Sequence, residues 1–301
     1  MGLNVHYGYT GLLNFGQVGF MLVGAYGLGI SVSIYGLPLF AGFLVGILAA
    51  VVLALLLGMP TLRLRADYLA IATIAAAEIL RFVFRSRPAT DFTGGTFGIP
   101  SQAGGPGFAG GWYALNPIPE GTYGFWRLQY NHRSLWAMFL GWGLVALVAL
   151  LVWALMRSPW GRVLRSIRED EDAARALGKN VFAYKMQSLV LGGVLGGLAG
   201  IALVIQQAGM TPDQFLPQIT FFAYVVLLLG GAATVMGPIL GAVIFWFLYN
   251  FSSSLLRQTG VVEGPQVGAV VLILVGLLLM GLMAFRPQGI LGNKREMMLD
   301  A

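Results

Sequence analysis

The sequence predicts an all-α, polytopic helical membrane protein, and three observations lead to this prediction. Of the 301 residues, 57% are hydrophobic and only 10% are charged, whereas soluble domains carry about 25% charged residues. The mean hydropathy is +0.79. Several apolar stretches reach the roughly 20 residues that a helix needs to cross a hydrocarbon core. We therefore expect one membrane-spanning domain over residues 1–301, with no separate soluble domain.

About eight hydrophobic segments follow one another along the chain. They lie at Gly8–Tyr35, Leu37–Met59, Tyr68–Phe84, Leu135–Met156, Met186–Gln207, Ile219–Val235, Ile239–Leu256 and Val267–Phe285. Two of these segments contain clusters of glycine, at residues 8–19 and at residues 230–237. Because glycine weakens a helix, we expect both segments to be broken or re-entrant, and the second to echo the first as a weak internal repeat.

A polar interval, residues 86–134, separates the third segment from the fourth. It is rich in glycine and proline, which favour turns over long helices. Trp112 and Trp126 can pack against the protein or lie at the level of the lipid headgroups. We expect an ordered extracytoplasmic loop with short elements; a disordered loop is the alternative.

The distribution of lysine and arginine predicts the orientation of the chain. The formal net charge is +6, but in membrane proteins basic residues concentrate in cytoplasmic loops, so we expect no nucleic acid partner. If residues 157–185 face the cytoplasm and the spans alternate, twelve of the 18 basic residues lie on that side. This scheme predicts a multi-pass protein of the cell (inner) membrane with a cytoplasmic C-terminus.

The loop formed by residues 157–185 holds the densest charge in the chain, with seven charged residues at positions 168–179. Ser166 followed by Glu169 is a capping-box pattern, which predicts that a helix begins there. Gly178 is expected to end that helix. The sequence therefore predicts a short amphipathic helix on the cytoplasmic side. The alternative is a solvated loop whose charges only set the topology.

Residues 172–178, with the sequence DAARALG, carry the first family resemblance. Ala173, Ala174 and Leu177 make a small apolar face at helical spacing, and Asn180 can cap the following helix. The stretch resembles the EAA loop of ABC importer permeases, with Asp in place of the usual Glu. In that family the loop forms the coupling helix, which docks into a cleft on the ATPase subunit. The resemblance therefore assigns coupling to the ATPase to Asp172, Ala173, Ala174, Leu177 and Gly178.

Three further stretches resemble the branched-chain amino acid permease family, specifically its LivM-type subunit. They are residues 8–16 (GYTGLLNFG), 93–99 (TGGTFGI) and 286–290 (RPQGI), so the resemblance covers nearly the whole chain. Members of that family usually carry a further hydrophobic segment before the first of these stretches. This difference leaves the helix count and the side on which Met1 lies open.

The resemblance implies a permease subunit that moves branched-chain or other hydrophobic amino acids by alternating access. Permeases for urea or short amides share these features and remain an alternative. The implied partners are a second related permease subunit forming a heterodimer, two ATP-binding cassette subunits and an extracytoplasmic substrate-binding protein. A Walker A loop is missing, because Gly178-Lys179 is followed by Asn180. We therefore expect ATP and Mg to be bound by the partner subunits, and no catalytic residue, metal or cofactor in this chain.

The first glycine-rich segment contains the candidate residues for the substrate pathway. Broken helices expose backbone groups that can hold the carboxylate and ammonium of a substrate, which makes Gly11, Asn14 and Gln17 candidates. Glycines that only permit close helix packing are the alternative. Glu78 is a further candidate, because charge within a membrane segment is rare; with Arg81 three residues later, it can instead form a satisfied i,i+3 pair.

Gly192, Gly196 and Gly200 recur every fourth residue, a spacing that lets helices approach closely in lipid. We expect them to pack against this subunit or a paired permease, with a substrate role as the alternative. An ion-coupled secondary transporter is the competing class of function, and Glu78 is its strongest support. A membrane-embedded enzyme would need convergent His, Asp or Glu residues, which the sequence does not offer.

Overall fold

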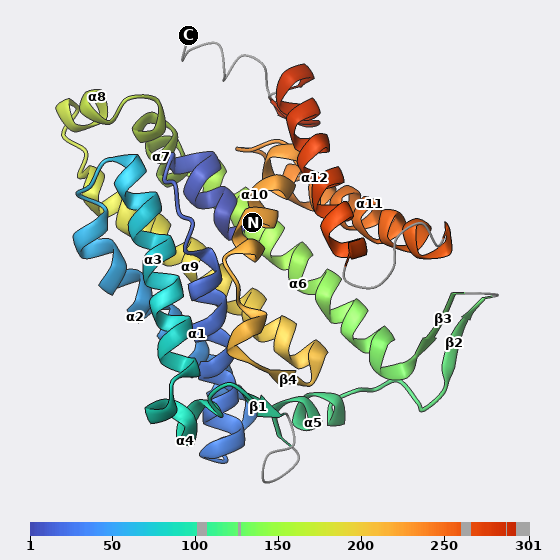
Figure 1. Ribbon diagram of the computed structural model, residues 1–301. Coiled ribbons are helices and arrows are strands. Elements are labelled where there is room, and N and C mark those ends of the chain that lie inside the picture. The colour runs from blue at the N-terminus through green and yellow to red at the C-terminus, as the bar shows by residue number, and fades with distance from the viewer. Residues whose placement is uncertain (101–106, 126–127, 260–265, 287, 293–301) are drawn as a thin grey trace.

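The computed structural model describes residues 1–100, 107–125, 128–259, 266–286 and 288–292 (Figure 1). Its elements in chain order are η1 (Asn4–Tyr9), α1 (Gln17–Gly29), η2 (Ile30–Ile34), α2 (Leu39–Thr61), α3 (Ala66–Arg85), η3 (Arg87–Ala89), α4 (Thr90–Thr93), β1 (Ile99–Pro100), α5 (Gly107–Ala114), β2 (Thr122–Phe125), β3 (Leu128–Asn131), α6 (His132–Arg157), α7 (Pro159–Glu169), α8 (Glu171–Ala176), α9 (Val181–Gln207), β4 (Gly209–Met210), η4 (Pro212–Gln214), α10 (Gln218–Gly230), α11 (Gly237–Thr259) and α12 (Gln266–Phe285). The two small sheets, β1–β4 and β2–β3, have two strands each. The rest of the fold is helical, as the sequence predicts.

Each of the eight predicted hydrophobic segments contains a helix, and within the described residues six helical stretches are long and apolar enough to cross a membrane. These are Gln17–Ile34, Leu39–Thr61, His132–Arg157, Val181–Gln207, Pro212–Gly230 and Gly237–Gln258. Of the other two, α3 carries charged side chains along its length, and α12 contributes a shorter apolar stretch, Gln266–Leu277. The prediction of a polytopic helical membrane protein is confirmed, and its count of eight is approximate.

Helix α1 lies in the middle of the bundle and packs between α2 and α9. Glycines bring the backbones together: a Cβ on Gly24 would lie 2.5 Å from the Cα of Gly197, and one on Gly27 would lie 2.6 Å from the Cα of Gly46. A Cβ on Gly200 would meet the carbonyl oxygen of Met21. The three helices therefore touch through backbone atoms, and no side chain could be added there without moving a helix.

Both glycine clusters interrupt helices, so the predicted breaks are confirmed. Between η1 and α1 the chain reverses direction, and Gly2 and Gln17 both end up beside Gly192. Between α10 and α11 the interruption covers residues 231–236, where Gly231 has a φ of +109°. The C-terminal segment covers this second interruption, because the backbone N–H of Ile290 donates to the carbonyl of Leu229 at 3.0 Å.

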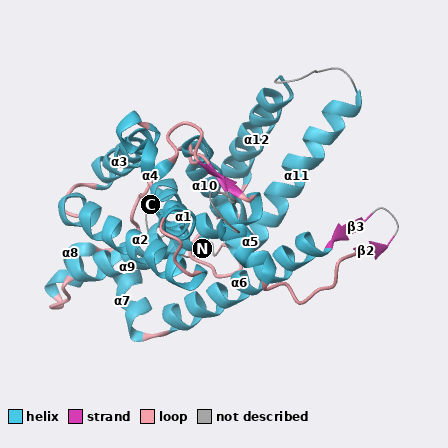
Figure 2. Ribbon diagram, turned by 90° about the horizontal axis from the view of Figure 1, so that it is seen from below, coloured by secondary structure: helices cyan, strands magenta, loops and turns pink. Residues whose placement is uncertain are grey.

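Residues 86–131 form short ordered elements wherever the structure describes them, as predicted, while the extracytoplasmic side of this loop stays a prediction. The stretch 93–99 makes a tight turn with positive φ at its glycines, and Ile99 then pairs with Met210 in the β1–β4 ladder. Trp112 packs near Phe43, with ring centroids 5.8 Å apart. Trp126 lies outside the described residues. Figures 1 and 2 show the β2–β3 hairpin projecting away from the helices beyond α6.

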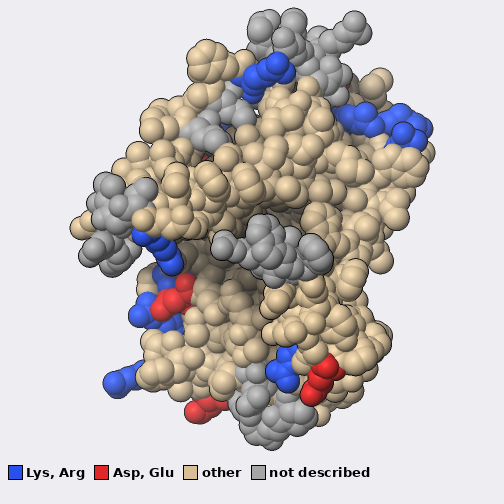
Figure 3. Space-filling view, turned by 90° about the vertical axis from the view of Figure 1, so that its right-hand side faces the viewer, with Lys and Arg blue, Asp and Glu red and all other residues tan. Residues whose placement is uncertain are grey.

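Large apolar side chains cover much of the outer surface. Phe40 is 74% exposed and Leu48 is 60% exposed on α2, which would be unfavourable in water and suits a hydrocarbon surrounding. Charged side chains are sparse on the face shown in Figure 3, where uncharged residues make up most of the surface. Exposed apolar surface together with a core held by backbone contacts is what a lipid environment requires of a helical bundle.

The close approach of α9 and α1 predicts the effect of adding one methyl group. We expect Gly200→Ala to destabilise the protein by about 1–3 kcal/mol, the usual cost of overpacking, because its Cβ would meet the backbone of Met21. The matched control is Gly143→Ala on α6, where nothing lies within 4 Å of an added Cβ and alanine favours the helix. Melting in detergent, followed by fluorescence-detected gel filtration, compares the two, and equal midpoints would contradict the prediction.

Candidate functional site

The charged loop between α6 and α9 forms two short helices at one end of the molecule. Helix α6 ends at Arg157, and Pro159 occupies the first turn of α7, where proline is well tolerated. Helix α8 follows and lies at the edge of the molecule, at the opposite end from α4, β1 and α5 (Figure 1). This end holds the site that the sequence assigns to coupling.

The start of α8 differs from the sequence prediction. Ser166 lies inside α7, and its hydroxyl donates to the carbonyl of Val163 at 2.9 Å, so the prediction that a helix begins at Ser166 is wrong. The N-cap is Asp170, whose side chain accepts the backbone N–H of Ala173 at 2.9 Å. Helix α7 begins at Pro159, a residue that is common in the first turn of a helix, and it continues past Ser166 to Glu169. The predicted end of α8 at Gly178 is confirmed by its φ of +75°.

The apolar residues of α8 divide between two faces. Ala174 is buried and packs against Ile167 and Val181, whereas Ala173 is exposed. Leu177 is 79% exposed at the end of the helix. The expected face of three apolar residues is therefore split, because Ala174 is needed to hold α8 against α7 and α9, and it is Leu177 with Asp172 and Ala173 that points outward.

Ion pairs fix α8 to the helix that follows it. Glu171 forms an ion pair with Lys185 on α9 and a second with Arg175, at 2.9 Å. Asn180 caps α9 by accepting the backbone N–H of Ala183 at 3.1 Å, as predicted. A cavity of about 590 Å³ opens beside these residues and is also lined by Arg63. Ion pairs thus add to the packing of Ala174 in holding this exposed helix in place.

Arginines of α7 tie the loop to the rest of the protein. Arg165 Nη2 donates to the carbonyl of Met156 at 2.7 Å, near the end of α6. Arg168 Nη1 donates to the carbonyl of Gly8 at 2.6 Å, at the end of η1. The charged loop therefore contacts the first helix interruption directly.

The predicted pathway residues at the first interruption lie in a buried polar network. Asn14 is fully buried and its Oδ1 accepts the backbone N–H of Gly16 at 2.9 Å, while its Nδ2 lies 3.1 Å from His6 Nδ1. Gln17 donates to the carbonyl of Gly192 at 2.9 Å. Gly11, by contrast, is exposed. The amides of Asn14 and Gln17 are engaged in holding the interruption, and a role beside the substrate pathway stays a prediction.

Neighbouring helices complete this network with hydroxyl groups. The backbone N–H of Phe15 donates to Thr73 Oγ1 of α3 at 3.1 Å, and that of Val18 donates to Thr220 Oγ1 of α10 at 3.0 Å. The hydroxyl of Tyr224 donates to the carbonyl of Asn14 at 3.1 Å. Sequence reasoning missed these partners, because a lone threonine or tyrosine in an apolar helix gives no signal of its distant partner.

The packing glycines of α9 face this same region. A Cβ on Gly192 would meet the ring of His6, one on Gly196 would meet Gln17, and one on Gly200 would meet Met21. The structure therefore places these glycines against η1 and α1 of the same chain. His6 is fully buried, and its Nε2 lies 3.2 Å from the carbonyl oxygen of Leu189 on α9.

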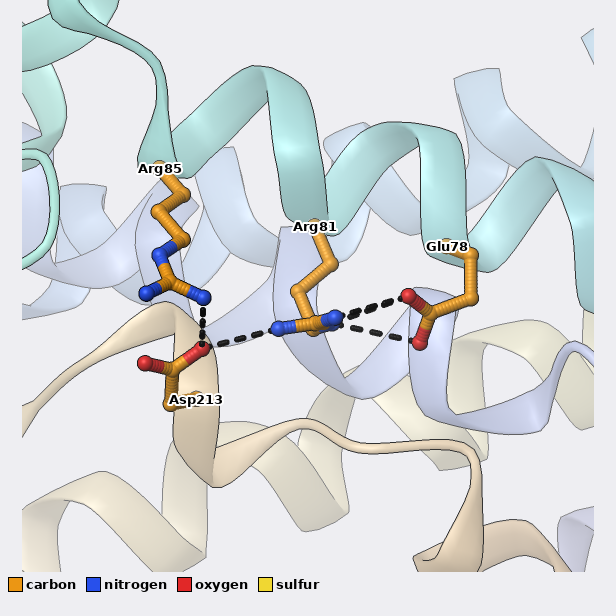
Figure 4. A network of polar contacts seen from close by, with 4 residues as sticks. All are labelled: Glu78, Arg81, Arg85 and Asp213. Atoms are coloured by element: carbon orange, nitrogen blue, oxygen red, sulfur yellow. Dashed lines mark hydrogen bonds and ion pairs between the residues drawn. The ribbon is translucent and has the colours of Figure 1, made fainter.

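Glu78 lies in a network of four charged residues near the end of α3 (Figure 4). Arg81 binds both oxygens of Glu78, the shorter contact being 2.8 Å, and its other amino group binds Asp213 of η4 at 2.8 Å. Arg85 is 3.4 Å from the same carboxylate of Asp213. The arrangement includes the satisfied i,i+3 pair and extends it to a residue 132 positions away, which the sequence alone did not reveal.

Among the described residues no group of three or more His, Asp and Glu side chains is arranged to hold a metal ion. The polar groups instead bind one another, through hydrogen bonds at the interruptions and ion pairs at the ends of the helices. Such an arrangement fixes the positions of helices relative to one another.

Comparisons with known proteins point to a single family. The family model described as "Branched-chain amino acid transport system / permease component" matches residues 1–283. The high-affinity branched-chain amino acid transport system permease protein LivM of Escherichia coli K12 is 32% identical over 300 residues, which cover 98% of this chain and 67% of the relative. The probable branched-chain amino acid transport permease protein LivM of Methanocaldococcus jannaschii is 24% identical over 340 residues, covering 98% of this chain and 89% of the relative.

Similarity also extends to a permease that is named for another substrate. The autoinducer 2 import system permease protein LsrC of Photorhabdus laumondii is 32% identical over 123 residues, covering 39% of this chain and 36% of the relative. No solved structure matches the chain. The family model and the LivM relatives span nearly the whole chain, whereas the LsrC match is partial. The chain therefore belongs to the family of branched-chain amino acid transport system permease components.

Proposed function

We propose that this chain is the membrane-spanning permease subunit of an ATP-driven importer, and that α8 is its contact with an ATP-binding subunit. Membership of the permease family supports the first part. The second part rests on one observation, the 79% exposure of Leu177 at the end of α8. Burying a leucine contributes about 1.5–3 kcal/mol, so a groove on a partner that covers Leu177 would bind this helix.

The fixed position of α8 supports a mechanical role. Ala174 and Glu171 hold the helix from inside through packing and ion pairs, while Asp172 and Leu177 are left on the outside. A helix attached on one face and exposed on the other can receive a push from a partner and pass it to α7 and α9. Alternating access then follows if ATP binding moves α8 of this chain and the corresponding helix of a second permease.

The proposed substrates are branched-chain or other hydrophobic amino acids. The two LivM relatives, which match 98% of this chain and are named as branched-chain amino acid transport permeases, support this assignment. An extracytoplasmic binding protein would deliver the substrate to the end of the molecule that carries α4, α5 and the β2–β3 hairpin. Urea, short amides and autoinducer 2, the last suggested by the LsrC match, are the competing substrates.

Glu78 favours an ATP-driven mechanism over an ion-driven one. A carboxylate that carries a coupling ion must release its partners during transport, but both oxygens of Glu78 bind Arg81, whose side chain is 9% exposed. Arg81 in turn joins α3 to η4 through Asp213. We therefore assign these residues to holding two elements together, and the energy for transport to the partner ATPase.

A charge placed at Leu177 tests the docking of α8. We expect Leu177→Asp to lower co-purification of the ATP-binding subunit by about tenfold, equivalent to roughly 1.4 kcal/mol, because the aspartate would have to be desolvated in the groove. The matched control is Leu115→Asp, which alters a leucine that is 64% exposed at the other end of the molecule. Loss of the ATP-binding subunit from both variants, or from neither, would contradict the proposal.

A substrate panel tests the proposed specificity. Vesicles containing the permease pair and the ATP-binding subunits, supplied with the binding protein, are expected to accumulate labelled leucine, isoleucine or valine only when ATP is enclosed. Urea, acetamide and autoinducer 2 are expected not to accumulate, because a site that fits an apolar side chain would give their polar groups no partners. Uptake of one of these three in place of the amino acids would replace the proposed substrate.

Variants of the charged network test the driving force. We expect Glu78→Gln to retain ATP-driven uptake, because Arg81 still binds Asp213. Arg81→Met should be the more damaging change and lower stability by about 1–3 kcal/mol, because it removes the donor that Arg81 gives Glu78 and leaves Asp213 with the longer contact to Arg85. Uptake and melting are measured for both variants. Uptake that follows an ion gradient without ATP, and that Glu78→Gln abolishes, would support the secondary transporter instead.

A further inference from the structure

We infer that Arg168 is the positioning residue that carries movement of α8 to the helix interruptions inside the membrane domain. The inference rests on the proposed function, since it assumes that α8 is moved by an ATP-binding subunit. It adds a specific connection: the guanidinium of Arg168 on α7 holds the end of η1 through the carbonyl of Gly8.

The bond between Arg168 and Gly8 joins complementary charges. The carbonyls at the end of a helix have no partner within it and carry partial negative charge, which favours a nearby cation. Arg168 Nη1 lies 2.6 Å from the Gly8 oxygen, a short contact, and hydrogen bonds with a charged donor are shorter and stronger than neutral ones. Arg168 is half-buried, so water and salt screen this bond less than they would on an open surface.

The stem of the arginine also touches the reversal of the chain. A Cβ on Gly11 would lie 3.2 Å from Cγ of Arg168, and Gly11 has a φ of +75°. A glycine at this position therefore satisfies both the backbone conformation and the close approach of the side chain. The segment contacts Arg168 on both sides of its turn, at Gly8 and at Gly11, and cannot shift relative to α7 without breaking these contacts.

The contact continues from the first interruption to the second. Asn4 Nδ2 donates to the carbonyl of Thr234 at 2.7 Å, and Asn4 Oδ1 accepts the backbone N–H of Ala233 at 3.0 Å. A Cβ on Gly8 would lie 2.5 Å from the nitrogen of Ala233. Displacement of Gly8 by Arg168 would therefore move the turn between α10 and α11 as well.

On the other side, Arg168 is adjacent to the residue on which α8 rests. Ile167 is buried and packs with Ala174, so movement of α8 is passed to α7 at the position next to Arg168. The other two arginines of α7 bind residues that are near them in the sequence. Arg162 Nη1 donates to the carbonyl of Arg157 at 3.4 Å, and Arg165 donates to the carbonyl of Met156. The bond of Arg168 reaches a residue 160 positions away.

The test compares Arg168→Met with Arg162→Met in the reconstituted complex. Both changes remove a guanidinium from α7, but Arg162 is exposed and bonded only weakly. We expect Arg168→Met to keep the ATP-binding subunits and ATP hydrolysis, while uptake per ATP hydrolysed falls about tenfold, equivalent to roughly 1.4 kcal/mol. Arg162→Met should keep the ratio of the parent protein. Equal ratios in the two variants would overturn the inference.

Conservative changes keep the test decisive if Arg168→Met does not assemble. Arg168→Lys keeps a charged donor and is expected to restore most of the uptake per ATP that methionine loses. Arg168→Gln keeps a neutral donor and is expected to fall between lysine and methionine, because neutral hydrogen bonds are weaker than charge-assisted ones. A glutamine variant that assembles and transports with the ratio of the parent protein would overturn the inference.

A distance measurement reads the movement itself. The chain contains no cysteine, so Leu13→Cys in the reversal and Leu115→Cys at the far end can carry two nitroxide labels in a complex whose other subunits are cysteine-free. We expect the distance between the labels to change on ATP binding, and the change to disappear with Arg168→Met and return with Arg168→Lys. A change that persists in the methionine variant, or is absent in the parent, would overturn the inference.

Different results would contradict the proposed docking of α8 and the proposed connection through Arg168. If Leu177→Asp keeps the ATP-binding subunits bound and transport intact, the proposed docking of α8 is wrong, and with it the basis of the inference. If Leu177→Asp loses the ATP-binding subunits while Arg168→Met transports normally, the docking stands and only the connection through Arg168 is wrong.

Discussion

Within a bilayer, the polar groups of a broken helix must find partners inside the protein, because the hydrocarbon offers none. The interruption between η1 and α1 meets this requirement with Asn14 and with hydroxyl groups from three helices. Thr73 of α3 and Thr220 of α10 accept hydrogen bonds from its backbone, and Tyr224 of α10 donates one to it. Ser188 of α9 binds the side chain of Thr10 at 2.7 Å. Satisfying one short segment therefore fixes the positions of α3, α9 and α10 around α1. The rest of the arrangement, including the contact with Arg168, depends on this segment being held.

Two kinds of contact hold the helices together in different parts of the molecule. Helices α1, α2 and α9 meet through glycine backbones, with Gly24 against Gly197 and Gly27 against Gly46, and such contacts leave little room for adjustment. The ends of the molecule also carry ion pairs between more exposed side chains, such as Glu171 with Arg175 and Asp213 with Arg85. Ion pairs near water can break and form again at modest cost, so the centre is rigid and the ends can change. This division fits a protein whose helices move as units.

Sequence reasoning recovered what local patterns encode. Hydrophobic runs located the helices, glycine clusters located both interruptions, and Gly178 and Asn180 marked the end of α8 and the start of α9 because capping is a local effect. The start of α8 was misplaced because Ser166 and Asp170 are both acceptable caps, and the preceding helix continues through the first. The bonds of Arg81 with Asp213 and of Arg168 with Gly8 join residues 132 and 160 positions apart, and no pattern in a single sequence pairs residues at that distance.

Hydrogen bonds between residues 288–292 and the end of α10 have a consequence for biosynthesis. The backbone N–H groups of Ile290 and Leu291 donate to the carbonyls of Leu229 and Gly230 at 3.0 Å each, and a Cβ on Gly231 would lie 2.5 Å from the nitrogen of Gly292. Those two carbonyls close the last turn of α10, yet their partners leave the ribosome about sixty residues later, at the rate of roughly 5–20 residues per second. During those seconds α11 and α12 are synthesised while the two carbonyls at the end of α10 still lack the partners that they have in the folded protein.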